Sequence, residues 1–514
     1  MLFGIVHRMI KIYLGTAWRN LYKYKLFTIV NMVGLAAGVA AFWIIALYVI
    51  DERSYDRYHQ NADRIFRAVQ HGKWSGGEFN LAVTAVPYAA ALKAEGGGKI
   101  IYGNKQINAG DILFTDNSFF KIFSYHFLSG DPANALAAPQ SVVLTRSLAE
   151  KIFGSPTDVL NKTINLGGAL QKVTGVIEDV PSNSHFTFSA LRSFDENYTG
   201  DWGNASVYTY VLLKNPGENK RIESRGELFF TRHLEDAMQG VQYRMELQPL
   251  TSIHLRSHLD YEIGNNGNIV YVNVFTIVAL LILGIAIINY INLTTARSTV
   301  RMKEIGVRKI IGSSWNQLML LFICESVLLA VFATAFGLLM AKMSLPFFNE
   351  VSGKSMDIWQ FGWEKSLGIF AGFAAITGLV SGIYPALFMS GFKAIPAIKG
   401  QISNRSSTLV FRKSLVTFQF VITIVMIVGS FVMYRQLHYV MNKDLGFNKS
   451  GMLTFHIDNF AARQKIESIK QEMLKSPLIE SIAAAGNPIG NNDLGSRDFN
   501  IGVDGNAAAD TKMV

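Results

Sequence analysis

Five long apolar segments constrain the fold of this chain more than any other feature. A helix needs about 20 apolar residues to cross the hydrocarbon core of a bilayer. With half of its residues hydrophobic and a mean hydropathy of +0.23, the chain is too apolar for an ordinary soluble protein and too polar to consist of membrane helices alone. The predicted spans are Phe27–Ile50, Ile269–Leu293, Leu318–Met340, Leu367–Met389 and Leu415–Tyr434.

The first apolar segment is expected to remain as a membrane span. It carries no charge over 24 residues, whereas a signal peptide has an apolar core of about 7–15 residues followed by a small-residue cleavage site. The charged residues Asp51, Glu52 and Arg53 follow here instead. We therefore interpret this segment as an uncleaved span.

The basic residues predict the orientation of the chain. Residues 1–26, 294–317 and 390–414 together hold 15 Lys and Arg against one acid, although the net charge of the whole chain is only +10. Loops on the cytoplasmic side of a membrane are enriched in Lys and Arg. We therefore expect a cytoplasmic N-terminus, and we interpret the basic excess as a topology signal that implies no nucleic-acid partner.

This orientation predicts an α-helical membrane protein with five transmembrane helices and a mixed α/β extracytoplasmic domain. The predicted parts are a cytoplasmic amphipathic lead (1–26), five spans (27–50, 269–293, 318–340, 367–389, 415–434), an extracytoplasmic domain (51–268), a cytoplasmic coupling segment (294–317), a short extracytoplasmic loop (341–366), a cytoplasmic loop (390–414) and the start of a second extracytoplasmic domain (435–514).

Alternating apolar residues predict strands in the two outer segments. In the larger domain we expect strands at 64–70, 141–145, 172–180 and 208–214, and a short helix over 147–153 that stops at Gly154. In the terminal segment we expect a strand at 452–457 and a helix over 461–474.

The lead before the first span has helical amphipathic spacing, with Ile10, Leu14, Trp18 and Leu21 on one side. A basic amphipathic helix lying in the membrane interface explains this pattern. An extension of the spanning helix into the cytoplasm explains it equally well.

The segment between the second and third spans combines charge with helical order. As a helix, it places Arg301, Glu304 and Arg308 in one stripe that continues from Arg297, and Glu304 could pair with both arginines. An adjacent apolar stripe holds Ala296, Val300, Val307 and Ile311. Gly312 predicts a helix stop, and Ser314 with Gln317 predicts a capping box that starts the third span. We expect a short amphipathic helix joined tightly to the next span, rather than a loose, solvated basic loop.

Several residues inside the spans carry further expectations. Glu325 is the one acid within a predicted span. Such groups default to functional candidates, but a static interhelical hydrogen bond is an equal alternative, and proton transport is the less favoured functional role. Two pairs of glycines four residues apart, Gly34 with Gly38 and Gly378 with Gly382, predict close helix packing.

Neither a metal site nor a nucleotide site is expected. His254 and His258 have i,i+4 spacing, but this is a weak signal for a metal. The glycine-rich stretch Gly96-Gly-Gly-Lys99 lacks the spacing of a phosphate-binding loop. We therefore predict no cofactor, no catalytic residue and no ATPase activity in this chain.

The sequence resembles permeases of the MacB/FtsX/LolE type of ABC transporter. The resemblance rests on RMKEIGVRKIIGSS (301–314), LFICESVLL (321–329), GLVSGIYPAL (378–387) and FKAIPAIK (392–399), and on AWRNL (17–21) and YDRYHQNADRIFR (55–67) around the first span. It covers nearly the whole chain. It implies a MacB-like periplasmic core domain, a location in the bacterial inner membrane, and a coupling segment that docks into a separate ABC ATPase subunit, present in two copies.

The resemblance also assigns roles to residues. It implies that the residues coupling the permease to the ATPase are Arg301, Glu304, Ile305, Gly306, Arg308, Lys309 and Gly312. It implies mechanotransmission, in which ATP hydrolysis in the partner moves the extracytoplasmic domain to export or extract a substrate. A regulatory scaffold that relays the state of the ATPase to an extracytoplasmic partner, such as a cell-wall hydrolase, is the alternative, and a membrane-anchored receptor without an ATPase is a third hypothesis.

The simplest members of this family have four spans around one exported domain. The fifth span and second exported segment of this chain resemble the duplicated branch of the family, so we expect either a missing second half or a second permease copy in the bilayer. The substrate cannot be predicted from the sequence.

Overall fold

A computed structural model describes most of the chain. The described residues exclude 1, 76, 86–90, 96–98, 195–204, 236, 237, 239, 392–405, 445–450, 456, 458, 459, 485–496, 502–508 and 514. Most of the expected cytoplasmic loop 390–414, with the FKAIPAIK motif, and the glycines of the 96–99 stretch therefore lie outside the described part. The chain divides into one unit of residues 1–258 with 262–429 and a second of residues 259–261 with 430–514.

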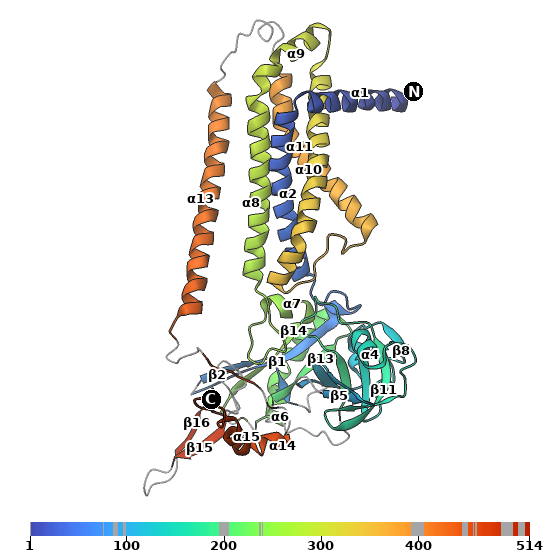
Figure 1. The fold of residues 1–514 in the computed structure, drawn as a ribbon, viewed down its shortest axis with the longest axis vertical. Helices are drawn as coiled ribbons and strands as arrows, with labels where there is room; N and C mark the ends of the chain where they lie inside the picture. The colour runs from blue at the N-terminus through green and yellow to red at the C-terminus, as the bar shows by residue number, and fades with distance from the viewer. Residues whose placement is uncertain are drawn as a thin grey trace. The chain divides into compact units, whose positions relative to one another are not determined.

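Five helices in the described part are long and apolar enough to cross a membrane. They are α2 (Lys25–Arg53), α8 (Ile269–Ala296), α10 (Trp315–Ser352), α11 (Trp363–Ser390) and α13 (Ser406–Asn442, with the apolar part Val410–Asn442). The first four run side by side as a bundle, with α2 packed between α8 and α10 and with α11 against α10 (Figure 1). The helices extend beyond the apolar runs predicted from the sequence, most of all α10 and α13.

Glycine allows α2 and α8 to approach closely. A methyl group added at Gly38 would collide with the side chain of Ala286, and one added at Gly34 would lie 3.3 Å from the Nδ2 atom of Asn289. Small residues at such crossings let backbones come together, which increases van der Waals packing between membrane helices.

Glycines also allow α10 and α11 to approach closely. A methyl group added at Gly378 would lie 2.5 Å from the Cα atom of Val327, and one added at Gly382 would lie 2.7 Å from the Cβ atom of Ser326. The hydroxyl of Ser326 also meets that of Tyr290 on α8 at 2.8 Å. Three helices are therefore held together at this level of the bundle.

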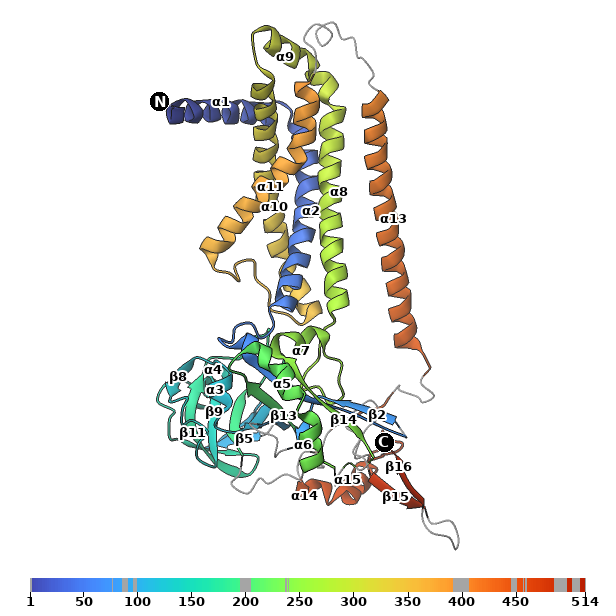
Figure 2. The same ribbon diagram turned by 180° about the vertical axis from the view of Figure 1, so that it is seen from behind.

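Helix α1 (Leu2–Lys23) lies crosswise to the bundle. It ends one residue before α2, and Tyr24 between them has the non-helical dihedrals φ −121° and ψ 57°. Figures 1 and 2 show α1 running away from the bundle, and it packs on α10. Of the two alternatives drawn from the sequence, the continuous extension of the first span is wrong, because the helix breaks at Tyr24.

The α/β domain is built on one mixed sheet between α2 and α8. Fourteen strands of the described residues join it, in the order β14-β1-β13-β4-β7-β12-β9-β11-β10-β5-β6, with β2, β3 and β8 attached to β1, β13 and β11. The strands are β1 (Ile65–Trp74), β2 (Gly77–Leu81), β3 (Thr84–Ala85), β4 (Ala91–Glu95), β5 (Lys99–Tyr102), β6 (Lys105–Asn108), β7 (Ile112–Thr115), β8 (Phe127–Gly130), β9 (Ser141–Thr145), β10 (Thr163–Leu166), β11 (Ala169–Ile177), β12 (Ala190–Ser193), β13 (Ala205–Leu212) and β14 (Gln242–Pro249).

Short helices connect and cover these strands. They are α3 (Phe119–Ile122), α4 (Arg146–Phe153), α5 (Asn219–Glu223), α6 (Gly226–His233) and α7 (Leu250–Arg256), with 3₁₀ turns at Ala62–Arg64 and Pro216–Glu218. The predicted strand over 141–145 and the helix that stops at Gly154 are confirmed, because Gly154 takes the left-handed conformation (φ 82°) that ends α4. The strands predicted at 64–70, 172–180 and 208–214 are present with shifted ends.

The second unit contains the helices α14 (Phe460–Arg463) and α15 (Ile466–Met473) and the hairpin β15 (Arg497–Ile501) with β16 (Ala509–Met513). The strand predicted at 452–457 is wrong where the structure describes it, since residues 452–455 form no ladder. An apolar run needs neighbouring strands to become a stable strand. The helix predicted over 461–474 is split between α14 and α15.

Candidate functional site

Helix α9 (Ser298–Ile310) forms a tight link between α8 and α10 at the end of the bundle away from the α/β domain (Figure 1). It follows α8 after Arg297 and ends just before Gly312. Gly312 has a φ of +100°, a backbone conformation that glycine adopts at little energetic cost because it has no Cβ atom. The Ser314 side chain then accepts a hydrogen bond from the Gln317 backbone, and the Gln317 side chain accepts one from Ser314. This capping box starts α10 without slack, as the sequence predicts.

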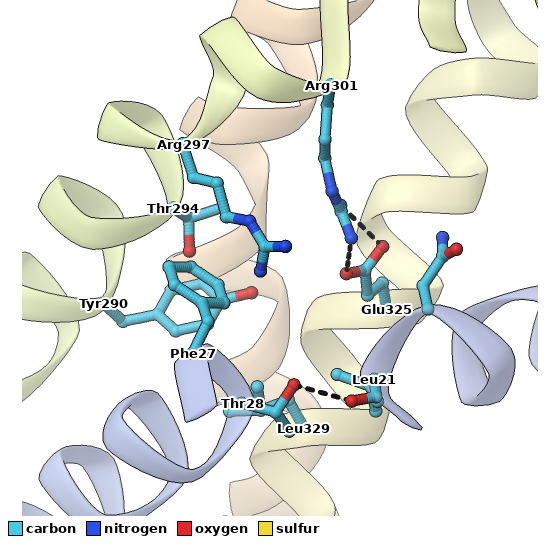
Figure 3. A pocket seen from close by; sticks show the side chains of 10 residues that line it. Leu21, Phe27, Thr28, Tyr290, Thr294, Arg297, Arg301, Glu325 and Leu329 are labelled. Atoms are coloured by element: carbon cyan, nitrogen blue, oxygen red, sulfur yellow. Dashed lines mark hydrogen bonds and ion pairs between the residues drawn. The ribbon is translucent and has the colours of Figure 1, made fainter. Parts of the chain in front are cut away.

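Arg301 of α9 turns inward and binds Glu325 of α10. Two hydrogen bonds of 2.6 and 2.9 Å join the guanidinium to the carboxylate, and the two side chains are only 8% and 12% exposed (Figure 3). The expected pair of Arg301 with Glu304 is replaced by this longer-range pair, because the carboxylate of Glu325 faces the same buried side of α9. Glu325 thus joins α10 to α9 through an interhelical ion pair.

Two further contacts fix the inner side of α9. Ile305 is buried in a small apolar cluster with residues of α10 and α11, and Gly306 beside it is also buried. The ammonium group of Lys309 donates a hydrogen bond of 2.7 Å to the carbonyl of Ser390, the last residue of α11. Helix α9 is thus fastened to both neighbouring helices.

The outer side of α9 is exposed and partly apolar. At the edge of the inner side, Arg308 pairs with Glu304 one turn away at 2.9 Å, and both side chains are about one-third exposed and line a small cavity with Arg301. Val307, Ile310 and Ile311 are 49%, 62% and 79% exposed at the helix end. Of the apolar stripe predicted from the sequence, Val307 and Ile311 therefore face outward, and the side chain of Val300 lies outside the described part.

An arginine stacked on aromatic rings lies beside this helix. The guanidinium carbon of Arg297 lies 3.6 Å from the ring centre of Tyr24 and 4.5 Å from that of Phe27, a cation–π geometry. Two small cavities flank Arg301, each of about 10 Å³, which is close to the room that one water molecule needs. Figure 3 shows the larger group of lining residues, from α1, α2, α8, α9 and α10. These cavities are too small for an organic substrate.

At the opposite end of the bundle, Lys354 joins the membrane helices to the α/β domain. It follows Gly353, which ends α10 in the left-handed conformation (φ 66°). Its ammonium group lies 2.8 Å from the carboxylate of Asp51, 2.7 Å from that of Glu52 and 2.8 Å from the hydroxyl of Tyr55. These lysine and carboxylate side chains are at most 14% exposed.

His254 of α7 completes this group, which we call the junction cluster (Asp51, Glu52, Tyr55, His254 and Lys354). Its Nε2 atom lies 3.0 Å from Glu52, and its ring stacks on Tyr55 with ring centres 3.4 Å apart. His254 thus belongs to an ion-pair network, and no group of three or more metal-ligating residues occurs in the described part of the chain.

The charge state of Lys354 is set by its hydrogen bonds within the junction cluster. Burial on its own would lower the pKa of Lys354, but hydrogen bonds to Asp51, Glu52 and Tyr55 outweigh it and raise the pKa above the ordinary value. A raised lysine pKa stabilises the fold at all pH values below the unfolded pKa of about 10.4, and this stabilisation is lost only at higher pH. Lys354 therefore remains charged throughout the physiological range.

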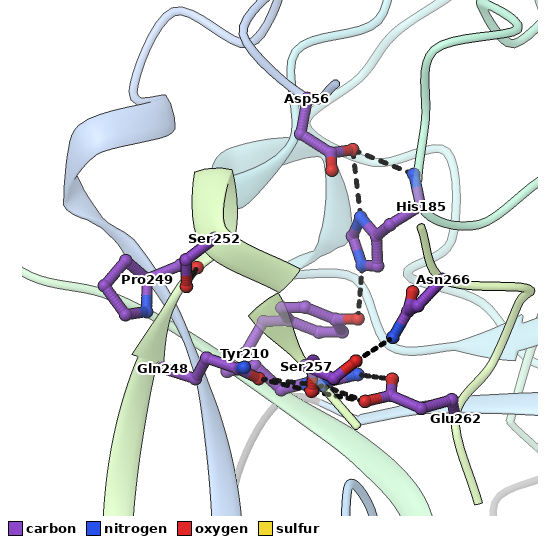
Figure 4. A network of polar contacts seen from close by, with 10 residues as sticks. Asp56, His185, Tyr210, Gln248, Pro249, Ser252, Ser257, Glu262 and Asn266 are labelled. Atoms are coloured by element: carbon purple, nitrogen blue, oxygen red, sulfur yellow. Dashed lines mark hydrogen bonds and ion pairs between the residues drawn. The ribbon is translucent and has the colours of Figure 1, made fainter. Parts of the chain in front are cut away.

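A second network holds the segment that leads into α8. Arg67 of β1 is fully buried and donates hydrogen bonds of 2.7 and 3.0 Å to Glu262, with others to Gln248 and Ser257. Figure 4 shows Gln248, Ser257 and Glu262 close together. Ser257 also binds Glu262, and Asn266 donates to the Ser257 carbonyl at 3.2 Å. The segment before α8 is thereby tied to β1, the second strand from one edge of the sheet.

A third network ties down the segment that leaves α2. His185 has Nδ1 2.9 Å from the carboxylate of Asp56 and Nε2 2.7 Å from the hydroxyl of Tyr210 on β13 (Figure 4). The side chain of Asn183 donates to the hydroxyl of Ser54 at 2.9 Å. Every connection between this domain and the α2, α8 and α10 helices is therefore braced by buried polar contacts.

Sequence reasoning missed the junction cluster. The sequence placed Lys354 in a short extracytoplasmic loop without a role and used Asp51 and Glu52 only to argue against a signal peptide. Two adjacent acids at the end of a span were the available signal, because such charges need a partner once they are buried. Their partner is about 300 positions away, and no local pattern reveals it.

Comparison with known proteins places this geometry in a family. A model of the MacB-like periplasmic core domain matches residues 28–225, and a model of the FtsX-like permease C-terminal domain matches residues 276–394. Together the two matches cover more than half of the chain, and the second includes α9 and both glycines of α11.

Two curated relatives extend the match. The macrolide export ATP-binding/permease protein MacB 1 of Yersinia pestis bv. Antiqua (strain Antiqua) is 19% identical over 433 residues, which are 74% of this chain and 59% of that protein. The pyoverdine export ATP-binding/permease protein PvdT of Pseudomonas savastanoi pv. phaseolicola is 23% identical over 398 residues, which are 72% and 56%. The chain thus spans less than two-thirds of the length of these relatives.

Among solved structures, the periplasmic region of MacB from Actinobacillus actinomycetemcomitans is 16% identical and covers 35% of this chain and 87% of that one, with a TM-score of 0.25. A domain of a permease protein from Porphyromonas gingivalis is 22% identical and covers 38% and 92%, with a TM-score of 0.34. With both family models matched in sequence order, this chain belongs to the family of FtsX-like ABC transporter permeases that carry a MacB-like periplasmic core domain.

Proposed function

We propose that this chain is the membrane subunit of an ABC transporter and that it transmits force from a separate ATPase to the α/β domain. Helix α9 receives the ATPase, the bundle carries the movement, and the junction cluster passes it to the sheet. ATP binding and hydrolysis are assigned to the partner. The substrate is handled on the outer side, for export or extraction.

The two unlike sides of α9 are the observation that carries this proposal. The inner side is fixed to α10 and α11 by the Arg301–Glu325 pair, Ile305 and Lys309. The partly exposed Arg308 lies at the edge of this inner side, and the outer side presents the exposed apolar residues Val307, Ile310 and Ile311 to a partner. A helix held in this way moves together with the spans when a partner pushes on it.

The opposite end of the bundle supports the same mechanism. A movement of α10 reaches Lys354 one residue beyond the helix C-cap, and Lys354 is bound to the end of α2 and to Tyr55 at the start of the domain. Removing one partner of a buried ion pair costs about 3–5 kcal/mol, so the connection resists separation. Force is then transmitted without a pore for the substrate.

The proposal includes an orientation and an assembly. The end of the bundle with α1 and α9 faces the cytoplasm, in keeping with its basic residues, and the α/β domain faces the outside of a bacterial inner membrane. Two ATPase subunits act on two bundles, the second supplied by another permease copy or by a second half of a longer chain.

Charge reversal at Arg308 tests the docking role. The variant Arg308→Glu is expected to insert normally, since Arg308 is outside the spans, and to lose the coupling of ATP hydrolysis to transport. The readouts are co-purification of the ATPase and the ATP hydrolysis rate of the complex in nanodiscs. Lys365→Glu, an exposed basic residue at the other end of the bundle, is the matched control.

A charge swap separates docking from helix stability. Arg308→Glu combined with Glu304→Arg restores the pair within α9, which is worth about 0.3–0.5 kcal/mol. If Arg308 binds the ATPase, the swapped variant remains uncoupled. Full recovery in the swap, or unchanged coupling in the single variant, would contradict the docking role. A coupled ATPase without any exported compound would favour the regulatory scaffold over export.

A further inference from the structure

Helix α1 carries basic side chains and no acidic ones. It contains four basic residues, Arg8, Lys11, Arg19 and Lys23, and no acid, and Lys25 follows at the start of α2. The first acidic residue of the chain is Asp51, at the far end of α2. The whole of α1 therefore lies crosswise to the bundle with one sign of charge (Figure 2).

The described side chains of α1 fall on two faces. Ala17 and Leu21 are buried, and Trp18 packs on Phe332 of α10 with ring centres 5.7 Å apart. Arg19 and Lys23 are exposed and point away from that face at helical spacing. An apolar side next to membrane helices and a basic side away from them is the pattern of a helix lying in the headgroup layer.

Exposed apolar groups continue beside the basic residues. Trp18 is 54% exposed, Tyr22 is 66% exposed, and Leu26 is 79% exposed. A soluble acidic protein or a free phosphate ion would leave this apolar surface in water. A phospholipid covers it with acyl chain while its phosphate meets the cations.

The turn between α1 and α2 gathers cations around one ring. The Lys23 ammonium lies 5.4 Å from the ring centre of Tyr24. The guanidinium carbon of Arg297, the residue between α8 and α9, lies 3.6 Å from the same ring centre. Arg301, 6.0 Å from that centre, is neutralised by Glu325. Lys25 lies 4.5 Å from the neighbouring ring of Tyr22. Positive charge from two separate elements thus meets at the level where α1 joins the bundle.

We propose that α1 and the α1–α2 turn, together with Arg297, bind the headgroup of an anionic phospholipid. Arg19, Lys23, Lys25 and Arg297 neutralise the phosphate, and Trp18, Tyr22 and Leu26 contact the glycerol and the upper acyl chains. Tyrosine and tryptophan are enriched at this depth of a bilayer, and basic pockets between helices on the cytoplasmic side suit anionic headgroups. The inference rests on the orientation given in the proposed function. It does not depend on the ATPase, so either can fail alone.

Native mass spectrometry of the purified full chain tests the site. The protein is titrated with phosphatidylglycerol or phosphatidylcholine, and the apparent affinity is read from the lipid-bound peaks. The variant Arg19→Gln/Lys23→Gln/Lys25→Gln is expected to bind phosphatidylglycerol at least tenfold more weakly, because each basic residue near an anionic surface contributes about fivefold. Phosphatidylcholine binding is expected to be unchanged, and Lys342→Gln/Lys365→Gln, with two exposed lysines toward the other end, is expected to behave as the wild type.

Three further measurements complete the test. Arg19→Lys/Lys23→Arg/Lys25→Arg keeps the charge and should retain the affinity, which shows that loss in the glutamine variant is not misfolding. Arg297→Gln should weaken phosphatidylglycerol binding several-fold, which a surface-only interaction of α1 would not give. Equal phosphatidylglycerol affinity in the glutamine variant and the wild type overturns the proposal. Displacement of phosphatidylglycerol by millimolar inorganic phosphate at constant ionic strength also overturns it, since the site would then bind the free ion.

Discussion

The ion pair between Arg301 and Glu325 yields the sharpest prediction about stability. The change is Glu325→Met, which leaves the guanidinium of Arg301 in a site where only 8% of its side chain is exposed. Arg301 then loses two charge-assisted hydrogen bonds of 2.6 and 2.9 Å. Since a buried charge without its partner cannot recover its hydration, we expect unfolding to become easier by about 3–5 kcal/mol.

The double variant decides whether the two residues act as one unit. Arg301→Met alone strands the carboxylate and should cost a similar amount. Arg301→Met combined with Glu325→Met removes both charges and should restore stability to within about 1–2 kcal/mol of the wild type, because replacing a whole buried pair with apolar groups is often neutral.

The single cysteine of the chain supplies the assay. Cys324 is partly buried on α10, so a thiol-reactive fluorescent dye reports the loss of packing in this region on heating. The substitution at position 325 could change dye access to Cys324 without changing stability. Circular dichroism of the same samples therefore measures the loss of helical structure independently. A double variant as unstable as the sum of the two singles would refute the reasoning, since Arg301 would then have a separate role such as direct docking.

Three other variants extend the account. In the α/β domain, burial lowers the pKa of His59 to about 4, with only partial offset from Asp56. As the pH falls from about 6.5 to 4, the unfolded state therefore binds an extra proton, and the free energy of unfolding decreases by up to about 1.4 kcal/mol per pH unit. Melting curves of His59→Gln over this range should show a shallower decrease, and a decrease identical to that of the wild type would contradict this account. Gly38→Leu should separate α2 from α8, since even a methyl group collides with Ala286, and lower the melting temperature by more than Gly38→Ala does; equal melting temperatures would count against the close crossing. Lys354→Met should leave two buried carboxylates without their cation at a cost of about 3–5 kcal/mol, and amide hydrogen exchange should rise over residues 51–56; unchanged exchange there would show that the cluster does not brace the junction.

Local patterns predict the membrane part of the fold well. The apolar runs gave α2, α8, α10 and α11, and Ser314, Gln317 and Gly312 gave the turn between α9 and α10. These features depend on residues that are close in the sequence. A helix propagates from its own backbone hydrogen bonds, and a cap requires only three or four residues.

Contacts between distant residues account for what sequence reasoning left open. Glu304 and Arg301 are spaced for a pair within α9, but Arg301 binds Glu325 because tertiary packing brings an unsatisfied carboxylate to its buried side. Lys354 carries no local signal, since its partners Asp51 and Glu52 are separated from it by the whole α/β domain. Pairing across such distances depends on the assembled fold, which periodicity does not encode.

The central claim is that α10 and the α/β domain move as one body when the ATPase turns over. Pulsed electron paramagnetic resonance tests it with spin labels at Glu150→Cys on α4 and Lys342→Cys on α10, two exposed positions, in a Cys324→Ser background and in the reconstituted complex. The account predicts one narrow distance distribution that stays the same with and without ATP, and that broadens when Lys354→Met is added. A distribution that broadens or shifts with ATP while Lys354 is intact would contradict rigid transmission through the junction.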